Sequence, residues 1–431
     1  MNLTRALPLS SLIFAFCYSG SAQTNAPPKI IAIRASHMLD VKAGSVISNV
    51  VVLIEEDKIR AAGPSLTIPS PAEIIELGEV TLLPGLIDCH THLMARIPPE
   101  PNGYGLNLLT KSQAFRALEG AADARITLRA GFTSVRDVEN EGSGYADVAL
   151  RDAVNQGLVE GPRMQVATRA IAAIGQYNPF GVSPDLRDFP TGAQMISGPE
   201  EARRAAREQI GSGADLLKVY ADWGRPTLTI DEIRAVVEEA HKSHLKVAAH
   251  ADSAEGIRNA LLAGVDSIEH GGFADRASLE LMKQKNAYWV PTKGNFFFRL
   301  DTVTNPRQRK YMQDVLDHAR QNIALARELG VKIANGFDAS SAQDHGHNAR
   351  EIVAMSKLGL SPLEAILAAT TTASELMGWQ DKVGSIEPGK YADIIAVPGD
   401  PLLDISQMEH VKFVIKGGVV IKNEIPLAAA H

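Results

Sequence analysis

The feature that most constrains the fold is an alternation of short apolar stretches with helix-like stretches through the middle of the chain. Eight apolar stretches are strand candidates, and each is followed by helix-like or loop sequence: TLLPGLIDCH, FTSVRD, PRMQVAT, ADLLKVY, LKVAAH, VDSIEH, AYWVPT and VKIANGFD. Eight β/α units in a row are typical of an α/β fold, the (β/α)8 TIM barrel. In that fold the chemistry lies at the carboxyl ends of the strands, so the polar residues that end these stretches are the candidates for function.

The two ends of the chain have a different pattern. Residues 29–84 and 379–425 contain short stretches rich in Val and Ile, separated by Gly and Pro turns, as in KIIAIRA and VKFVIKGGVVIKN. Such stretches are typical of strands. We therefore predict a small β-sandwich domain formed by these N- and C-terminal segments, with the barrel spanning residues 85–378.

Residues 1–22 have the pattern of an export signal. Arg5 is the only charge before the apolar run LPLSSLIFAFCYSGSA, which ends in the small residues Gly20 and Ala22. A buried core strand is the alternative. The run is too short to span a bilayer comfortably, and no second apolar span follows. We expect an exported protein, periplasmic or secreted after signal removal, that keeps only Cys89 and so has no internal disulfide.

The overall charge bears on the kind of partner. The formal net charge is −7, whereas nucleic-acid binding needs a concentrated basic face. We expect a small-molecule partner, no nucleic acid and no membrane span. A homo-oligomer is left open by the sequence.

Histidines and an aspartate end several of the predicted strands. His90 and His92 close the first strand, where residues two apart project to the same side. The fifth, sixth and eighth strands end in His250, His270 and Asp338. A lone histidine of this kind is more often structural. Together at one rim of a barrel, these imidazole and carboxylate groups predict a site for zinc or a similar divalent ion.

A lysine interrupts the apolar fourth strand, GADLLKVYAD. In one interpretation, Lys218 extends to solvent or pairs with an acid such as Asp222. In the other, burial near cations depresses its pKa, so that the neutral amine adds carbon dioxide. The resulting carbamate is an anionic ligand with two oxygens that could bridge two metal ions. Because Lys218 ends its strand at the same rim as the histidines, we favour the second interpretation.

These motifs resemble the amidohydrolase superfamily. PGLIDCHTHL leads into the barrel and GSIEPGKYADIIAV leads out of it, and VRD, LLKVY, HADSAEGIRNALLAGVDSIEHG and HGHNARE narrow the resemblance. They are similar to the binuclear branch that holds prolidase-like and carboxypeptidase-like enzymes and ochratoxin-hydrolysing amidohydrolases. The resemblance implies two divalent ions, with zinc expected. It assigns one ion to His90, His92 and Asp338, the other to His250 and His270, and the bridge to carboxylated Lys218.

The resemblance also implies a reaction. Two divalent ions about 3.5–4 Å apart can share a hydroxide that attacks the scissile carbonyl near neutral pH. Asp338 would take its proton as general base and pass it to the leaving amine as general acid. We predict a metal-dependent amidohydrolase that releases a C-terminal amino acid from a dipeptide, an N-acyl amino acid or an ochratoxin A-like amide.

Three polar residues are candidates for substrate binding. Tyr220 lies two residues after Lys218, Arg136 ends the second strand, and His345 opens the loop after the eighth. Together they could hold a free carboxylate. The alternative for Arg136 is a structural ion pair with Asp137 or another acid.

Several other segments could shape the pocket. The loop 174–199 contains Tyr177, Phe180 and Phe189, and the segment 294–300 contains three consecutive phenylalanines; either could cover an apolar substrate. Packing beneath a helix is the alternative for the three phenylalanines. Two features depart from the pattern of the resembled family: Phe337 stands before Asp338, and the segment VENEGSG after VRD is acidic rather than Gly-rich.

Other functions remain as alternatives. A mononuclear deaminase of the same superfamily lacks the strand-four lysine and commonly carries Glu three residues after the strand-five histidine, where this chain has Ser253. A cyclic-amide hydrolase or a lactonase would share the metal chemistry. A non-catalytic binding protein typically loses metal ligands, and no ligand position is missing here.

Overall fold

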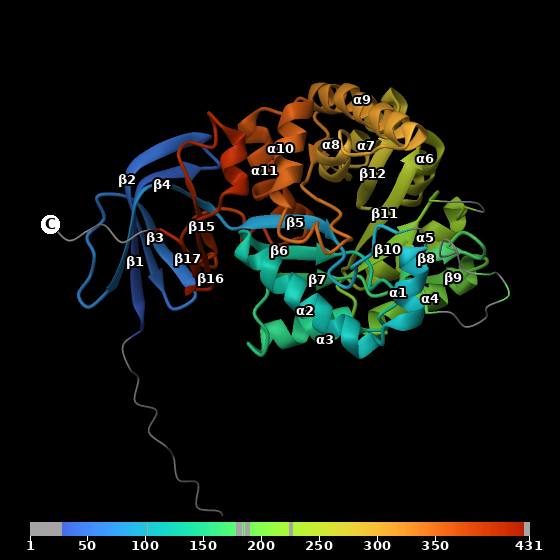
Figure 1. Ribbon diagram of the computed structural model, residues 1–431, viewed down its shortest axis with the longest axis horizontal. Coiled ribbons are helices and arrows are strands. Elements are labelled where there is room, and N and C mark those ends of the chain that lie inside the picture. Colours follow the sequence, from blue (N-terminus) through green and yellow to red (C-terminus); the bar gives the residue numbers. More distant parts are fainter. Residues whose placement is uncertain are drawn as a thin grey trace, which may run out of the picture.

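The computed structural model describes residues 28–100, 102–177, 183, 185, 190–223 and 227–425. The predicted export signal, 1–22, lies outside the described residues, as do Phe180 and Phe189. Figure 1 shows two parts side by side, a β-rich part built from both ends of the chain and a larger part of alternating strands and helices.

The β-rich part is a seven-stranded sheet in the order β17-β16-β15-β4-β1-β2-β3. Its strands are β1 (Ile30–Asp40), β2 (Ser45–Glu55), β3 (Lys58–Pro64), β4 (Glu73–Pro84), β15 (Ile394–Pro398), β16 (Phe413–Lys416) and β17 (Val419–Asn423). The two chain ends meet where β4 pairs with β1 on one side and with β15 on the other. Val, Ile and Phe side chains such as Ile33, Val52 and Phe413 form its core. The predicted β-rich domain from both termini is confirmed, and its strands join in one continuous sheet.

The chain passes from the sheet into the barrel at a tightly packed glycine. β4 ends at Pro84 and the first barrel strand begins at Leu86, with Gly85 between them. A Cβ at Gly85 would overlap the side chain of Thr133 on the neighbouring strand. A glycine is therefore required where the chain enters the barrel.

The larger part is the predicted (β/α)8 barrel. Its strands are β5 (Leu86–Thr91), β6 (Phe132–Asp137), β7 (Arg163–Val166), β10 (Leu216–Tyr220), β11 (Lys246–Ser253), β12 (Ser267–Phe273), β13 (Tyr288–Val290) and β14 (Lys332–Ile333). Neighbouring strands pair in parallel. Single backbone hydrogen bonds join the remaining neighbours. Between β5 and the segment after β14, Cys89 N donates to Asn335 O (2.8 Å). Between β7 and the start of β10, Asp215 N donates to Val166 O (2.8 Å).

The sequence did not predict two short strands. β8 (Ala170–Ala173) and β9 (Ala193–Ile196) follow β7 and pair in parallel, and β8 also pairs with the end of β10. They support the segment that carries Tyr177 towards the rim of the barrel.

Helices lie between the strands and cover the outside of the barrel (Figure 1). They are α1 (Gly103–Thr110), α2 (Gln113–Arg129), α3 (Ala146–Asn155), α4 (Pro199–Gly211), α5 (Ile230–Lys242), α6 (Ala254–Ala263), α7 (Arg276–Gln284), α8 (Gly294–Arg299), α9 (Pro306–Leu329), α10 (Ala349–Leu358), α11 (Pro362–Ala368) and α12 (Thr371–Leu376), with a 3-10 turn at Ile405–Glu409. Small and branched residues such as Ala205 and Val236 pack their inner faces onto the strands. Of the helices in the described residues, none has the length and apolar character needed to cross a membrane.

Candidate metal centre

The carboxyl ends of the barrel strands surround a cavity of about 290 Å³. All six predicted metal ligands line it: His90, His92, Lys218, His250, His270 and Asp338. They come from the ends of β5, β10, β11 and β12 and from the segment after β14. The barrel therefore brings together residues that are up to 248 positions apart in the sequence (338 − 90 = 248).

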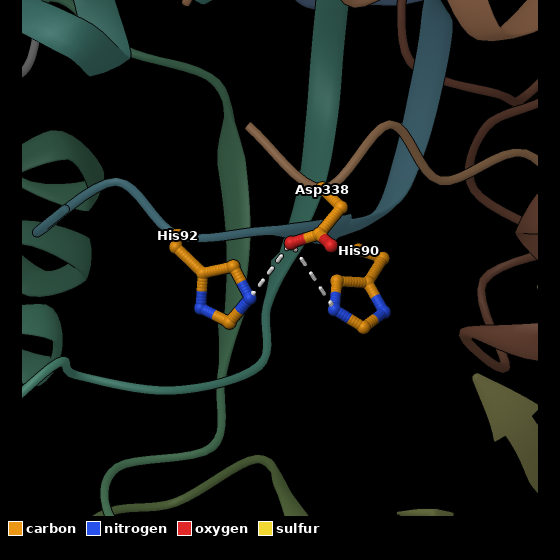
Figure 2. A group of neighbouring side chains, drawn as sticks. All are labelled: His90, His92 and Asp338. Atoms are coloured by element: carbon orange, nitrogen blue, oxygen red, sulfur yellow. Dashed lines mark ion pairs between the residues drawn. The ribbon is translucent and has the colours of Figure 1, made fainter. Parts of the chain in front are cut away.

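Three of these residues form a tight group. The carboxylate of Asp338 lies between the two histidines of β5 (Figure 2). Its Oδ1 is 3.2 Å from His92 Nε2 and 3.7 Å from His90 Nε2. One ligand atom from each residue lies within 4.8 Å of the others, which is the spacing that a single metal ion needs.

The other two histidines adjoin this group. The rings of His250 and His270 are 4.4 Å apart, and the His270 ring is 4.8 Å from that of His90. His270 Nδ1 also lies 4.0 Å from Asp338 Oδ2. The rings of His92, His90, His270 and His250 therefore follow one another, and the carboxylate of Asp338 lies beside the first three.

Buried carboxylates orient the histidines of β5. His90 Nδ1 hydrogen-bonds with Glu269 Oε2 at 2.7 Å, whereas His92 Nδ1 lies 2.9 Å from Glu141 Oε1 as an ion pair without hydrogen-bond geometry. Each contact uses the nitrogen remote from Asp338 and leaves Nε2 directed at the cavity. This is the arrangement in which metal-ligating histidines are usually held. These residues thus fit a metal ion on the Nε2 side.

The second pair of histidines has weaker support. His270 Nδ1 lies 2.7 Å from Thr292 Oγ1, a neutral partner. His250 Nε2 is buried without a hydrogen-bond partner among the described residues. A buried polar atom of this kind calls for an explanation, and a metal ion would provide one.

Electrostatics act in different directions on these groups. Burial lowers the pKa of His92, but the charge of Glu141 and the contacts with Asp338 and Glu141 outweigh it and hold that pKa well above its usual range. His92 must therefore release a proton to bind a metal ion. Burial, followed by the nearby Lys218, holds the pKa of His90 well below its usual range, so its imidazole is neutral as a metal ligand must be. Burial alone would raise the pKa of Asp338, but the hydrogen bond from His92 and the positive charge of that imidazole outweigh it and lower that pKa. Asp338 is therefore a carboxylate across the physiological range.

Lys218 is buried at the base of the cavity, with 1% of the residue exposed. In the part of the chain that the structure describes, its Nζ makes no hydrogen bond and no ion pair. Asp222, the suggested partner, instead accepts hydrogen bonds from the backbone of Asp252 and Ser253. Burial lowers the pKa of Lys218, although Glu269 and Asp338 oppose the shift. The lysine is thus neither at the solvent nor paired with Asp222.

The backbone at the strand ends is strained. His270 and Asp338 have φ values of 70° and 61°, and Thr292 has 55°. Residues other than glycine rarely adopt this left-handed region, which costs on the order of 1–3 kcal/mol each. Asp338 N donates to His90 O at 2.7 Å, and this bond helps to hold the strained conformation. Two of these residues are candidate metal ligands and Thr292 supports one of them, although non-glycine residues elsewhere, such as Asn49, also have positive φ values.

The structure corrects the substrate-binding prediction for Arg136. Its guanidinium donates to Glu269 Oε1 (2.7 Å), Cys89 O (2.6 Å) and Ser267 Oγ (3.2 Å), and it does not line the cavity. Arg136 instead forms the structural ion pair that was the alternative interpretation. Its partner is another acid, Glu269, and not Asp137. Arg136 therefore reaches the centre only through Glu269, which orients His90.

His345 also lies away from the cavity. It is buried, its Nε2 lies 2.9 Å from Ala95 O and 3.5 Å from Asp123 Oδ2, and it does not line the cavity. Its role is to connect the loop after β14 to the loop after β5. Tyr220 is the one member of the predicted trio that lines the cavity.

The remaining cavity wall is aromatic and acidic. Besides the metal-ligand candidates it contains Ile97, Tyr104, Glu141, Tyr177, Tyr220, Trp223 and Ser340. Sequence reasoning missed Tyr104, Trp223 and the role of Glu141. The acidic segment VENEGSG was the available signal, since it carries both Glu139 and Glu141. Burial, then the charge of Glu141, raises the pKa of Glu139 to about 7.

The phenylalanines singled out in the sequence lie elsewhere. Phe296, Phe297 and Phe298 belong to α8 and pack partly buried against the barrel core, as the alternative interpretation expected. Phe337 is buried and does not line the cavity, so it does not narrow the pocket directly. Its backbone N donates to Asp88 Oδ1, which also accepts from His90 N.

Comparison with known proteins agrees with this geometry, since residues 81–421 match the Amidohydrolase family. The chain belongs to the amidohydrolase family. It is therefore an enzyme that hydrolyses C–N bonds, in a family that is generally metal-dependent.

Individual amidohydrolases are similar over nearly the whole chain. An ochratoxinase of Aspergillus niger is 30% identical over 419 residues, covering 88% of this chain and 84% of the ochratoxinase. The crystal structure of a Xaa-Pro dipeptidase with bound methionine in the active site has a TM-score of 0.81 at 34% identity, covering 91% of this chain and 99% of that one. A prolidase complexed with N-methylphosphonate-L-proline has a TM-score of 0.83 at 29% identity, covering 92% and 100%.

Proposed function

We propose that this amidohydrolase uses two divalent metal ions to cleave a peptide-like amide and release a C-terminal amino acid. The observation that carries the proposal is the convergence of four histidines, Asp338 and the buried Lys218 on one cavity, where the lysine Nζ makes no hydrogen bond or ion pair with the residues that the structure describes. A single ion would use only part of this ligand set. The buried lysine amine has a role if it becomes an anionic bridge.

The residues divide into two ligand groups. His90, His92 and Asp338 would hold one ion, and His250 and His270 the other, with zinc the expected metal because its preferred ligands are imidazole and carboxylate. When bound, two such ions activate a water molecule near neutral pH and polarise the carbonyl of the substrate.

Lys218 would join the two groups as a carbamate. Its neutral Nζ forms a bond to the carbon of carbon dioxide, and one proton leaves to water. The lowered pKa of the buried amine favours this step, because only the neutral amine has a free electron pair. The product is an anion that suits a site between two cations.

Asp338 would move the proton. Its side chain is 33% exposed and borders the cavity, so its carboxylate can reach a water molecule there. As general base it accepts a proton from that water, and as general acid it returns the proton to the nitrogen of the leaving amine. His90 and His92 keep the carboxyl group oriented, and they keep it ionised before it accepts the proton and after it returns it.

The substrate class follows from the similar proteins. An ochratoxinase, a Xaa-Pro dipeptidase and a prolidase are similar to this chain over most of its length. We therefore propose dipeptides, N-acyl amino acids or ochratoxin A-like amides as substrates. Arg136 and His345 are not proposed to hold the substrate carboxylate, since both are engaged away from the cavity.

The test combines metal analysis with a substrate screen. Bound metal is measured per chain, and N-acyl amino acids, Xaa-Pro dipeptides and ochratoxin-like amides are assayed for release of a free amino acid. Two ions per chain with amide cleavage support the proposal. One ion with ammonia released from a heterocycle would indicate a deaminase, and cleavage of lactones alone would indicate a lactonase.

Export is a separate part of the proposal and rests on residues 1–22. Expression of the full chain in a Gram-negative bacterium should give a periplasmic or secreted product that has lost this segment. N-terminal sequencing of the purified product tests this directly. A cytoplasmic product that begins at Met1 would contradict it.

A further inference from the structure

Glu139 lies behind the cavity wall and binds two of its tyrosines. It follows β6 in the acidic segment VENEGSG and is completely buried. Tyr177 Oη donates to its Oε1 at 2.7 Å, and Tyr220 Oη donates to its Oε2. One carboxylate thus connects the end of β10 to the segment after β8.

The position of Glu139 is fixed from several sides. The backbone N of Val138 donates to Thr91 O (3.1 Å), and that of Asn140 donates to Thr168 O (2.9 Å). A Cβ at Gly192 would overlap Glu139 Oε1, so the carboxylate is packed directly against the backbone there. Glu139 therefore has no room for another rotamer on that side.

This placement determines what the tyrosines offer to a substrate. The rings of Tyr177, Tyr220 and Trp223 lie 5.0–5.5 Å from one another and line the cavity, and the Tyr220 ring is 5.2 Å from that of His250. The hydroxyl hydrogens of Tyr177 and Tyr220 are engaged by Glu139, so neither is free to bind a substrate carboxylate. What Tyr177 and Tyr220 offer to a substrate is therefore the apolar surface of their rings, and the polar groups of the wall are those of Tyr104, Glu141 and Ser340.

We propose that Glu139 is a positioning residue for substrate selection: it holds Tyr177 and Tyr220 so that, with Trp223, they form an aromatic wall, and this wall selects amides that carry a flat apolar ring. The proposal rests on the amide-hydrolase function proposed above. Aromatic rings favour such a partner because offset and edge-to-face ring contacts add to the burial of apolar area. It assigns a role to an acid that the metal chemistry does not use.

The test compares substrates with and without a ring. N-benzoyl-alanine and N-acetyl-phenylalanine carry the ring on opposite sides of the amide, and N-acetyl-alanine carries none. The wild-type enzyme should prefer at least one ring-bearing amide. In Glu139→Ala, KM for that amide should rise about tenfold while kcat changes less than about threefold, and both constants for N-acetyl-alanine should stay near wild type.

Conservative and control variants separate positioning from a general loss of structure. Glu139→Gln keeps an acceptor for one tyrosine and should show a smaller rise in KM. Glu79→Gln alters an exposed acid of the β-rich sheet and should change neither constant. Bound metal should be the same in all of these variants.

Two further variants test the proposal if Glu139→Ala does not fold. Tyr177→Phe removes one hydroxyl but keeps the ring, and Gly192→Ala displaces the carboxylate without altering it; both should raise KM selectively for the ring-bearing amide. An equal fall in kcat for all three substrates, or no change in KM, would overturn the role of Glu139. If the wild type cleaves no amide at all, the proposed function fails instead.

Discussion

The two halves of the predicted ligand cluster are supported differently. On the β5 side, His90 and His92 each have a buried carboxylate within 2.9 Å of the nitrogen remote from the cavity. On the other side, His270 Nδ1 has a neutral threonine, and His250 Nε2, the buried atom without a hydrogen bond among the described residues, lies 3.6 Å from Asp252 Oδ2. A carboxylate partner fixes the tautomer and raises the basicity of the imidazole. Nearby carboxylates therefore prepare His90 and His92 to bind a metal ion. In the part of the chain that the structure describes, His250 and His270 have no comparable support, so binding of the second ion depends on the bridging group proposed at Lys218.

The largest expected effect comes from Asp338, the proposed carboxylate ligand of the first ion, which is also proposed to carry the proton. Asp338→Asn should reduce kcat by about 10³-fold or more, because it removes both the proton carrier and a charged ligand. Steady-state kinetics together with metal analysis measure this, with Asp314→Asn on the exposed face of α9 as the control. Near-normal turnover by Asp338→Asn would show that the proton takes another route.

The difference between the two halves is tested by replacing, in each half, one residue that contacts a ligand histidine. Glu141→Gln should weaken binding of the first ion about 10- to 100-fold, the usual cost of losing a carboxylate partner of a ligating histidine. Thr292→Ala should weaken the second ion less, because its hydroxyl is neutral. Titration against a competing chelator gives both affinities. Equal losses in the two variants would mean that the charge of the support does not distinguish the halves.

The fold and the ligand set could be predicted because they follow from local patterns. His90 and His92 are two residues apart on one strand, and His250, His270 and Asp338 each follow an apolar run. The alternation of strands and helices then places these ends at one rim. No long-range information was needed to propose them as one site.

The surroundings of the site could not be predicted, because they depend on tertiary contacts. Arg136 and His345 were interpreted as substrate ligands, but their partners, Glu269 and Asp123, lie on other elements and leave no signal near them in the sequence. The strands β8 and β9 were missed because four residues each are too short for a recognisable period.

The smallest expected effect concerns Glu351, a buried acid near the half of the ligand cluster that contains His270. Glu351 is fully buried near Lys293, whose Nζ donates to His270 O at 3.2 Å. Burial raises the pKa of Glu351 from 4.5 to about 7. A raised carboxyl pKa means that the folded state holds the proton more tightly, so this contribution to stability is complete below pH 4.5 and is lost as the pH rises through about 7.

Glu351→Gln should remove this dependence. The slope of the unfolding free energy against pH between 5 and 7 should become less negative by at most about 1.4 kcal/mol per pH unit. Denaturant unfolding of the metal-free protein at several pH values measures the difference from wild type. An unchanged slope would mean that Glu351 is already ionised in the folded protein at pH 5.

The central claim is that Lys218 becomes an anionic bridge between two ions, and it is tested most directly by counting metals in two proteins. Wild type and Lys218→Ala are loaded with zinc in the presence of ¹³C-labelled bicarbonate, and bound zinc and carbamate ¹³C signal are measured per chain. The account predicts two ions and one carbamate in wild type, and at most one ion, no carbamate and little activity in the variant. Two ions and normal amide hydrolysis in Lys218→Ala would contradict it.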